Sequence, residues 1–442
     1  MHIFLPWQMR RYIFSHMIKH LTSLLLGGVL LSQPVISCGN TKQPGSVQQS
    51  DKASSEIEAE VKNVSSESTL LTGADQTSEY LSDLKGKKVG MVVNPTSIIG
   101  NTHSVDSLRS LKINIVKVFG PEHGFRGEAS AGAKVNSNID GKTGLPVISL
   151  YGSHYKPTVE DLEGIDIMVF DIQDVGVRFY TYISTLHYIM EACAENKIKL
   201  IVLDRPNPNG FYVDGPVLEE KFKSFIGMHP IPILHGMTIG EYATMVNGEG
   251  WLKGKIKCDL KIVKLKGYNH DMDYTLPVKP SPNLNTQQSI LLYPSLCLFE
   301  GTIISQGRGT HMPFQILGSP ALKGKYDFTF TPVSIKGMSE TPLHQNQLCY
   351  GLDLRKYDTS VFKKTGQLNL SWLIDMYNAY PEKEKFFDFK QSKQINNFNR
   401  LAGNDKLQKQ IASGLSEQEI RASWEPELSA FKEMRKKYLL YP

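Results

Sequence analysis

The sequence predicts an α/β fold, in which a Rossmann-like subdomain with a parallel sheet is followed by a smaller α+β subdomain. Two observations support this prediction. Short apolar runs alternate with amphipathic helical stretches through the first half of the chain, which is the pattern of strand–helix–strand units. Polar residues directly follow these runs, and in open α/β sheets the ligand binds where the strands end.

The expected strands are apolar runs at residues 88–93, 114–119, 147–150, 165–171 and 200–204. Between the last two, Ile183, Leu186 and Ile189 recur at helical spacing, which predicts a helix over residues 182–196. Units of this kind are right-handed with parallel strands, so we expect a parallel sheet.

The loop after the first expected strand contains no phosphate-binding glycine motif. Asn94-Pro95-Thr96-Ser97 stands where a dinucleotide-binding fold carries G-x-G-x-x-G. We therefore expect no cofactor, and an oxidoreductase that uses a dinucleotide is disfavoured.

The second half is predicted to be rich in loops, with helices at residues 371–380 and at the C-terminus. Two capping-box patterns, Thr238 with Glu241 and Ser416 with Glu419, indicate helix starts. We place the boundary between the subdomains near residue 250. Residues 71–250 then form the Rossmann-like subdomain and residues 251–442 the α+β subdomain.

Residues 1–37 are predicted to be a signal peptide, because Arg10, Arg11 and Lys19 accompany an apolar run that is too short to span a bilayer. Ser37-Cys38 follows and resembles a bacterial lipobox, so Cys38 is the expected lipidated residue; the alternative is a cleaved signal with a chance cysteine. Residues 38–70 are polar and nearly lack aromatics, which is typical of a disordered tether. We expect a secreted protein held in the cell envelope by a lipid anchor in the membrane.

Composition and cysteine spacing disfavour other partners. The formal charge of +5 falls to +2 once the three cations of the signal peptide are removed, which gives no support for nucleic-acid binding. The cysteines of the remaining chain are widely separated, without metal-ligand spacing, so we expect no metal from them. A disulfide and buried free thiols are both open alternatives.

The loop after the second expected strand, residues 120–127, holds the first candidate site, with the sequence GPEHGFRG. Burial raises a carboxyl pKa and a cation such as Arg126 lowers it, and glycoside hydrolysis needs a carboxylic acid as proton donor. Glu122 is therefore a candidate general acid, with His123 and Arg126 as candidate substrate-binding residues. The alternative is an ion pair between Glu122 and Arg126 that only stabilises the loop.

Residues 171–182, DIQDVGVRFYTY, follow the fourth expected strand. An arginine such as Arg178 can hold a carboxylate through two parallel hydrogen bonds, and Tyr180 can stack on a sugar while offering its hydroxyl. Gln173, and Asn94 at the first strand end, are further candidate substrate contacts. The alternative is a structural network, in which Asp174 caps the helix and Arg178 pairs with Asp171.

Two further places carry candidate residues. Asp204 begins the turn DRPNPNG and is either a turn former or a substrate contact. Glu300, Ser305 and Arg308 form a polar cluster that can close over a cleft or serve as a loop ion pair. The residue types alone thus indicate an α/β hydrolase of unspecified type.

At these residues the chain resembles the NamZ-type exo-β-N-acetylmuramidases. The resemblance extends from about residue 71 to the C-terminus, and one position departs from it, because Gln306 stands where the family often has an acidic residue. The matching stretches include FGPEHGFRG (119–127), DIQDVGVRFYTY (171–182), LDRPNPNG (203–210), HGMTIGE (235–241), YPSLCLFEGT (293–302) and GRGT (307–310).

The resemblance implies an active-site cleft between the two subdomains and release of non-reducing terminal N-acetylmuramic acid from peptidoglycan chains or fragments, in cell-wall turnover. It also implies that Glu122 is the catalytic glutamate. The second catalytic group is either Asp174, as the base for water, or the acetamide of the substrate. The lactyl carboxylate of the sugar requires a cation, for which Arg178, Arg126 and Arg308 are candidates.

Two other classes of function compete with this one. A non-catalytic lipoprotein that binds peptidoglycan fragments would keep the arginines and aromatics but would not need Glu122. A metal-dependent hydrolase would use His123, Asp171 and Asp204, but the sequence lacks H-E-x-x-H or a comparable ligand spacing.

Overall fold

The computed structural model describes residues 70–126, 138–387 and 398–442. The predicted signal peptide, Cys38 and all but the last residue of the tether therefore lie outside the described residues. Among the described residues, no helix is both long and apolar enough to cross a membrane.

A seven-stranded sheet with the order β5-β6-β4-β1-β7-β8-β9 organises the first half of the chain. Its neighbouring strands are parallel except for β5 and β6. Numbered along the chain without β5, the order is 3-2-1-4-5-6, which is that of the Rossmann fold. The strands are β1 (Val89–Val93), β4 (Ile115–Gly120), β5 (Asn138–Ile139), β6 (Pro146–Ser149), β7 (Ile167–Asp171), β8 (Lys199–Leu203) and β9 (Leu260–Val263).

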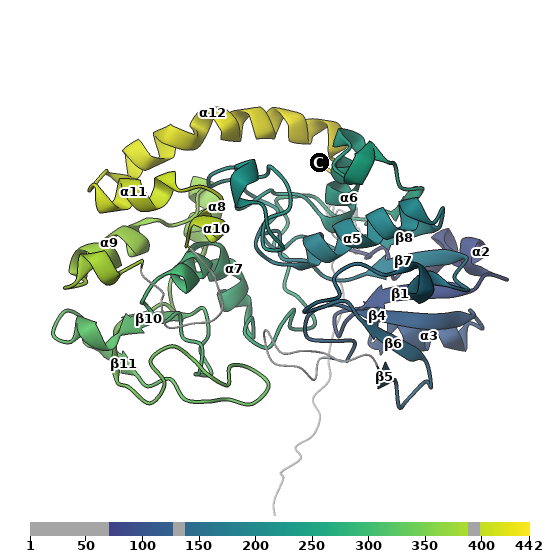
Figure 1. The fold of residues 1–442 in the computed structure, drawn as a ribbon, viewed down its shortest axis with the longest axis horizontal. Coiled ribbons are helices and arrows are strands. Elements are labelled where there is room, and N and C mark those ends of the chain that lie inside the picture. The colour runs from purple at the N-terminus through teal and green to yellow at the C-terminus, as the bar shows by residue number, and fades with distance from the viewer. Residues whose placement is uncertain (1–69, 127–137, 388–397) are drawn as a thin grey trace, which may run out of the picture. The chain divides into compact units, whose positions relative to one another are not determined.

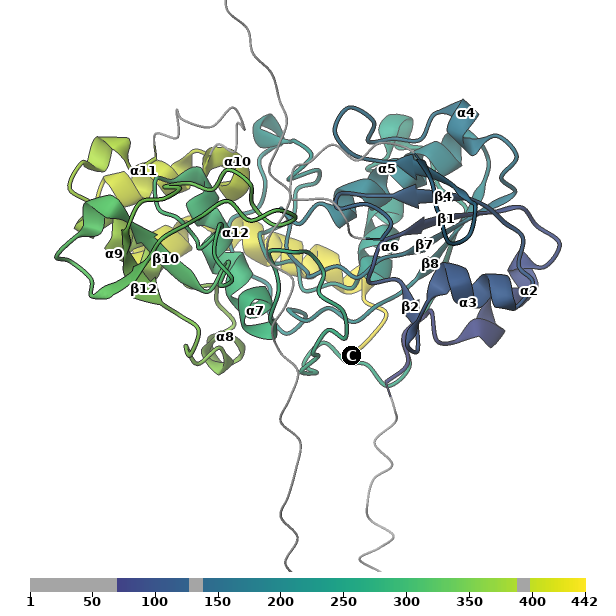
Figure 2. The ribbon, with the colours of Figure 1, turned by 90° about the horizontal axis from the view of Figure 1, so that it is seen from below.

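Both faces of the central strands are buried, and their side chains alternate between two hydrophobic cores. Val92 and Phe170 belong to the core that includes α5 (Tyr182–Glu195) and α6 (Ile239–Glu249). Met91 and Val169 belong to the core that includes α2 (Leu81–Leu84) and α3 (Ser104–Ser110). Figure 2 shows α3 and α5 on opposite sides of the sheet. Parallel strands buried on both faces read as continuous apolar runs, which is why the sequence predicted them.

The predicted fold class is confirmed. The five predicted strands correspond to β1, β4, β6, β7 and β8, and the helix predicted over residues 182–196 is α5. Thr238 and Glu241 form the predicted capping box of α6, and Ser416 and Glu419 form that of α12 (Glu417–Arg435). Strand β9 was not expected from the sequence, and its first three residues are only partly buried.

The second half of the chain is built around a small antiparallel sheet with the order β10-β12-β11 (Figure 1). Its strands are β10 (Ile316–Ser319), β11 (Phe328–Phe330) and β12 (Cys349–Asp353). Its helices, besides α12, are α7 (Gln287–Leu296), α8 (Ser360–Thr365), α9 (Ser371–Ala379), α10 (Phe398–Ala402) and α11 (Lys406–Ala412). Short elements of the first half are α4 (Val159–Leu162), β2 (Ile98–Ile99) and β3 (Thr102–His103).

The two halves share one hydrophobic core, because Phe119 and Leu186 belong to the same cluster as Leu373 and Leu428. Residues 67–442 accordingly form one compact unit.

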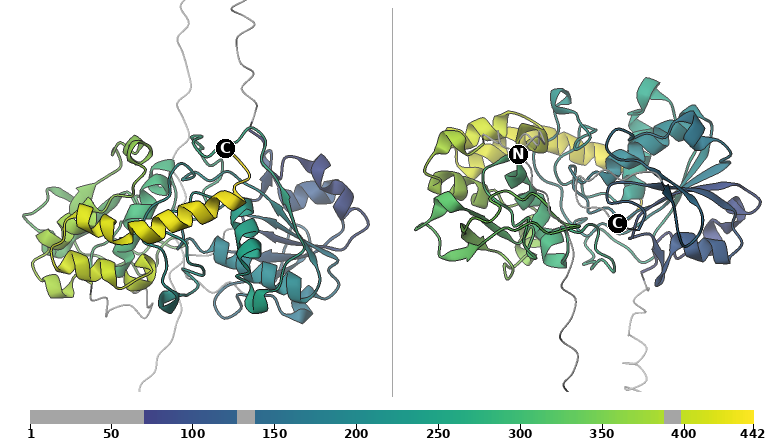
Figure 3. Two further views of the ribbon diagram at one scale, coloured as in Figure 1. Left: turned by 90° about the horizontal axis from the view of Figure 1, so that it is seen from above. Right: turned by 60° about the horizontal axis from the view of Figure 1, so that its bottom comes forward.

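Helix α12 leads the chain back to the large sheet, as Figure 3 shows. After it, the Tyr438 hydroxyl donates to the Glu249 carboxylate (2.6 Å) and the backbone N–H of Leu440 donates to Glu241 (2.7 Å). The Tyr441 hydroxyl donates to the buried carboxylate of Asp204 (2.6 Å). The last residues of the chain thus bind the end of β8 and both ends of α6.

The described residues contain neither a disulfide nor a cluster of possible metal ligands. Cys193, Cys258, Cys297 and Cys349 are all buried free thiols there. In the same ranges, no group of three or more His, Cys, Asp or Glu side chains is placed to hold a metal ion.

Candidate active site

A cavity of about 470 Å³ opens at the carboxyl edge of the large sheet and is lined by residues from both halves of the chain. Most of its first-half residues come from the loops that follow β4, β6 and β7, where ligands bind in open α/β sheets, and Phe225 and Ile226 come from the segment between β8 and α6. Four of the predicted site residues line it, namely Glu122, His123, Tyr180 and Arg308.

Glu122 follows β4 in a tight turn. His123 (φ 71°) and Gly124 (φ 76°) both adopt left-handed backbone conformations, and the N–H of Gly124 donates to the carbonyl of Pro121 (2.9 Å). The Thr181 hydroxyl, just before α5, donates to Glu122 Oε2 (3.1 Å). Burial, the charge of Glu122 and a hydrogen bond to Glu122 raise the pKa of Tyr151, which follows β6. Hydroxyl groups from two neighbouring loops therefore orient the Glu122 carboxyl group.

A second carboxyl group enters the cavity from the other half of the chain. Glu300 Oε1 accepts hydrogen bonds from Arg308 Nε (2.5 Å) and Gln306 Nε2 (3.0 Å). The Cys297 thiol lies 3.7 Å from Glu300 Oε2. Burial lowers the pKa of Arg308, but the charge of Glu300 and the hydrogen bond to it, with smaller contributions from Tyr293 and Cys297, together outweigh burial and raise the pKa. The Arg308 guanidinium also lies over the Phe314 ring, at 5.1 Å, so its orientation is fixed.

Tyr180 contributes to a buried aromatic wall of the cavity. Its hydroxyl donates to the carbonyl of Pro280 (2.8 Å), and its ring packs edge-to-face against Tyr182 (4.9 Å) and Tyr293 (5.9 Å). The wall joins the loop after β7 to α7, so it also connects the two halves of the chain.

Asp174, a predicted catalytic residue, does not line the cavity. Its side chain is buried, and Oδ2 accepts the backbone N–H of Gly176 (2.7 Å). Burial raises the pKa of Asp174 to about 7. The Asp174 carboxyl group thus accepts a hydrogen bond within the turn before α5 and does not face the cavity.

Arg178, the first candidate for a carboxylate-binding cation, does not line the cavity either. It is fully buried and donates to the carbonyl oxygens of Pro216 (2.7 Å), Ile231 (2.8 Å) and Leu401 (2.8 Å). Burial lowers the pKa of Arg178 to about 9. The expected alternative, a pair with Asp171, is not formed either, because the described partner of Asp171 is Arg205.

Arg126 forms an ion pair, but not with Glu122. Its Nε and one terminal nitrogen bind the two oxygens of Asp140, both at 2.8 Å, and Asp106 lies 3.6 Å away. The hydrogen bond to Asp140 raises the pKa of Arg126. Arg126 is therefore already matched by carboxylates and does not line the cavity.

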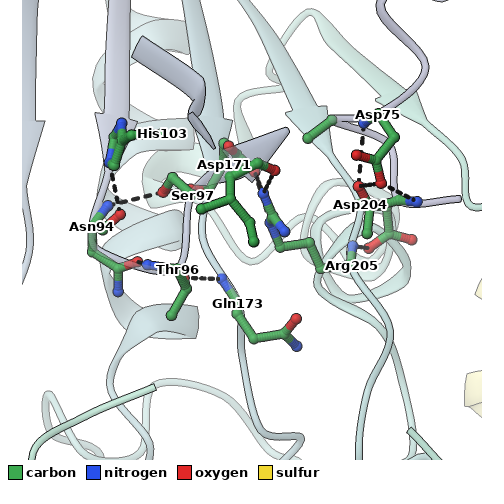
Figure 4. A network of polar contacts seen from close by, with 12 residues as sticks. Asp75, Asn94, Thr96, Ser97, His103, Asp171, Gln173, Asp204 and Arg205 are labelled. Atoms are coloured by element: carbon green, nitrogen blue, oxygen red, sulfur yellow. Dashed lines mark hydrogen bonds and ion pairs between the residues drawn. The ribbon is translucent and has the colours of Figure 1, made fainter. Parts of the chain in front are cut away.

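Asn94 and Gln173 belong to a network that connects the strand ends (Figure 4). Asn94 Oδ1 accepts the hydroxyl of Thr96 (2.5 Å), and Thr96 in turn accepts the backbone N–H of Gln173 (3.0 Å). The Gln173 amide donates to the carbonyl of Pro206 (2.6 Å). Asp204 is also engaged internally, by the Gly240 N–H (2.8 Å) and by hydroxyl groups. These three residues, which were predicted to contact the substrate, instead form hydrogen bonds within the protein and do not line the cavity.

Several cavity residues were not identified from the sequence. Tyr151 and Tyr155 directly follow a predicted strand, so the rule that ligands bind at strand ends would have found them. Thr181 lies inside a quoted motif but was not chosen as a site residue. Phe225 lies in a short turn and gave no signal.

The fold and the cavity define a Rossmann-type protein with two carboxyl groups, those of Glu122 and Glu300, in a cavity at the carboxyl edge of its sheet. The family model described as exo-β-N-acetylmuramidase NamZ, N-terminal, matches residues 89–288, and the corresponding C-terminal model matches residues 291–441. The chain belongs to this family of glycosidases, which confirms the resemblance seen in the sequence.

Individual relatives agree with this assignment. The chain is 44% identical over 383 residues to the peptidoglycan β-N-acetylmuramidase NamZ of Bacillus subtilis (strain 168), covering 82% of this chain and 89% of that protein. Crystal structures of two DUF1343-family proteins from Bacteroides fragilis are also similar. One is 45% identical with a TM-score of 0.77 and the other 30% identical with a TM-score of 0.72. Each covers 84% of this chain and 99% of its own.

Replacing Asp174 with Asn tests its structural assignment. Because the folded-state pKa of Asp174 is raised from 3.8 to about 7, the native state holds a proton that the unfolded state releases within this range. The contribution of Asp174 to stability is therefore fully present below pH 3.8 and is lost as the pH rises toward 7. We expect the free energy of unfolding of Asp174→Asn, relative to wild type, to rise between these pH values and then level off. Urea unfolding across this range measures it.

Activity provides the second readout for the same variant. A residue outside the cavity that only supports a turn should leave kcat/KM within a few-fold of wild type. A loss of about a hundredfold or more, the contribution expected of a general base, would instead assign Asp174 to catalysis.

Proposed function

We propose that the protein is an exo-acting glycosidase that releases non-reducing terminal N-acetylmuramic acid from peptidoglycan chains or fragments, in cell-wall turnover. The observation that carries the proposal is the placement of Glu122 in the cavity, with its carboxyl group oriented by Thr181 and bonded to Tyr151. Family membership and the named activity of the Bacillus subtilis relative support the choice of sugar.

In this mechanism Glu122 is the general acid. Its proton passes to the glycosidic oxygen as the bond from that oxygen to the anomeric carbon breaks. Water then attacks the anomeric carbon, its hydroxyl stays on the sugar and its second proton returns to Glu122. The hydroxyl groups of Thr181 and Tyr151 hold the carboxyl group that carries the transferred proton. Because Asp174 does not line the cavity, the acetamide of the substrate is favoured as the second group, attacking the anomeric carbon from within the sugar.

Arg308 is the cation that we assign to the lactyl carboxylate. Of the three candidate arginines, it alone is among the described residues that line the cavity. Its described hydrogen bond uses Nε, and an arginine can form two parallel bonds to a carboxylate. Its side chain keeps 26% of its surface exposed, so a ligand can reach it.

Glu122→Gln tests the proposed acid. On a chromogenic β-N-acetylmuraminide, we expect the variant to lose about 10²- to 10⁴-fold in kcat, because an amide cannot donate the proton. The N-acetylglucosaminide analogue should be a poor substrate for wild type. Glu163→Gln is the matched control, since Glu163 is exposed and does not line the cavity, and it should keep full activity.

The same assay separates the two classes of function. If wild type binds N-acetylmuramic acid in calorimetry but never releases the chromophore, the protein is a binding lipoprotein and the assignment of Glu122 as acid fails. A Glu122→Gln variant with wild-type turnover would leave the enzyme in place but remove Glu122 from the mechanism.

Arg308→Lys tests selection of the lactyl group. Lysine keeps the charge but loses the paired geometry, so we expect kcat/KM for the muraminide to fall about ten- to a hundredfold. The value for the N-acetylglucosaminide, which has no carboxylate, should change much less. The ratio of the two values is the measurement. An equal fall for both substrates would mean that Arg308 acts only by holding Glu300.

Anchoring through Cys38, and with it a location in the cell envelope, is a further part of the proposal. It rests on residues 1–70, whose pattern predicts a lipoprotein signal and a tether. In a bacterial host, wild type should incorporate a labelled fatty acid and sediment with membranes, whereas Cys38→Ala should do neither. Unlabelled wild type in the soluble fraction would overturn this part and leave the enzymatic proposal untouched.

A further inference from the structure

Three aromatic rings form a platform beside Glu122. Tyr155 and Phe225 stack with their centroids 4.1 Å apart and their planes at 28°. Tyr188 lies 6.3 Å from each, with its plane within 17° of theirs. We call these three residues the aromatic platform. All three are partly exposed, and Tyr155 and Phe225 line the cavity.

The platform is fixed to α5 from several directions. Tyr188 is part of the helix, and the Ser184 hydroxyl of the same helix donates to the carbonyl of Phe225 (2.6 Å). Lys156, next to Tyr155, forms ion pairs with Glu191 (2.6 Å) and Glu195 (2.7 Å) near the end of α5. The rings are therefore ordered before any ligand arrives, which reduces the entropy that binding would cost.

The same helix connects the platform to the proposed acid. Thr181, which donates to Glu122, is the N-cap residue of α5. Tyr151, which also bonds Glu122, packs edge-to-face against Tyr155 at 6.3 Å. After burial, the charge of Glu122 is the main cause that raises the pKa of Tyr155. The platform thus adjoins the group that would contact the glycosidic oxygen.

The chemistry of the two cavity walls differs in a way that matches the two sugars at the scissile bond. Arg308 and Glu300, from the second half of the chain, supply charge. The platform supplies flat apolar faces, and the nearby Lys156 is already paired with two carboxylates. N-acetylmuramic acid carries a carboxylate, whereas the N-acetylglucosamine that follows it in peptidoglycan is neutral and presents C–H groups that aromatic faces bind.

We infer that the aromatic platform is the subsite for the leaving sugar, where the N-acetylglucosamine that follows the scissile bond stacks on the outer face of the stacked pair of Tyr155 and Phe225. This inference rests on the proposed function, because it takes Glu122 as the acid that protonates the oxygen between the two sugars. It assigns the platform to recognition of the departing chain rather than of the released N-acetylmuramic acid.

Tyr155→Ala, compared on two substrates, tests the inference. The first is the β-linked disaccharide of N-acetylmuramic acid and N-acetylglucosamine, and the second is methyl β-N-acetylmuraminide, whose methyl group is too small to reach the platform. We expect kcat/KM to fall about tenfold on the disaccharide, the size of one stacking contact, and to stay within about twofold on the methyl glycoside. Product release by chromatography measures both.

Inhibition by free N-acetylglucosamine gives an independent readout. Its inhibition constant should rise about tenfold in Tyr155→Ala and return toward the wild-type value in Tyr155→Trp, which restores a ring. Phe328→Ala is the matched control, because Phe328 is a partly exposed aromatic on β11 that does not line the cavity. If Tyr155→Ala has a lowered melting temperature, Phe225→Leu replaces it with the same expectations.

The outcomes distinguish this inference from the function on which it rests. An equal fall in kcat/KM on both substrates would mean that the platform binds the N-acetylmuramic acid. An unchanged kcat/KM on the disaccharide would mean that the platform binds neither sugar. Either result overturns the inference. If wild type cleaves neither substrate, the proposed function itself fails.

Discussion

The buried ion pair between Asp171 and Arg205 connects the strand ends at the carboxyl edge of the large sheet. Both side chains are almost fully excluded from solvent, at 0% and 2% exposure, and the distance between them is 2.7 Å. Arg205 also donates to the carbonyl of Ile98 (2.9 Å), so it joins the ends of β7 and β8 to the β2 segment. Removing one partner of a buried pair leaves an uncompensated charge, at a cost of about 3–5 kcal/mol.

This pair stands at the crevice between β1 and β7, where a Rossmann fold of this strand order binds a nucleotide. Ser97, Thr96 and Gln173 complete the closure by bonding one another and the backbone of Asp171. Because the protein's own polar groups are bonded across the switch point, the cavity forms beside it, over the loops after β4, β6 and β7.

Much of the fold could be predicted from the sequence, because parallel strands buried on both faces leave long apolar runs. The position of Glu122 followed from the same logic, since it comes directly after such a run. Thr181 and Tyr151 could not be assigned to it, because their contact depends on β6, β4 and β7 lying near one another in the sheet order 3-2-1-4-5-6. Strand order is a property of the folded chain, and only the strand positions are visible in the sequence.

The arginines show a second limit of sequence reasoning. Arg178 stands in the most polar motif, yet its partners are three backbone carbonyls that lie 38 to 223 residues away along the chain. A carbonyl oxygen is present at every residue, so such partners leave no trace in the sequence. Arg308, by contrast, pairs with a carboxylate eight residues away, which is why the cluster of Glu300 and Arg308 was recognised.

The charge balance around Arg308 depends on the neutral side chain of Gln306. Gln306 donates to the same oxygen of Glu300 that Arg308 binds, at 3.0 Å and 2.5 Å respectively. A carboxylate at position 306 would lie against Glu300 and repel it, and would compete with a substrate carboxylate for Arg308. The neutral amide instead adds a hydrogen bond to Glu300 and no charge. The described ion pair of Arg308 with Glu300 uses Nε, which orients the guanidinium, and this is the condition under which it can bind the acidic sugar that we propose.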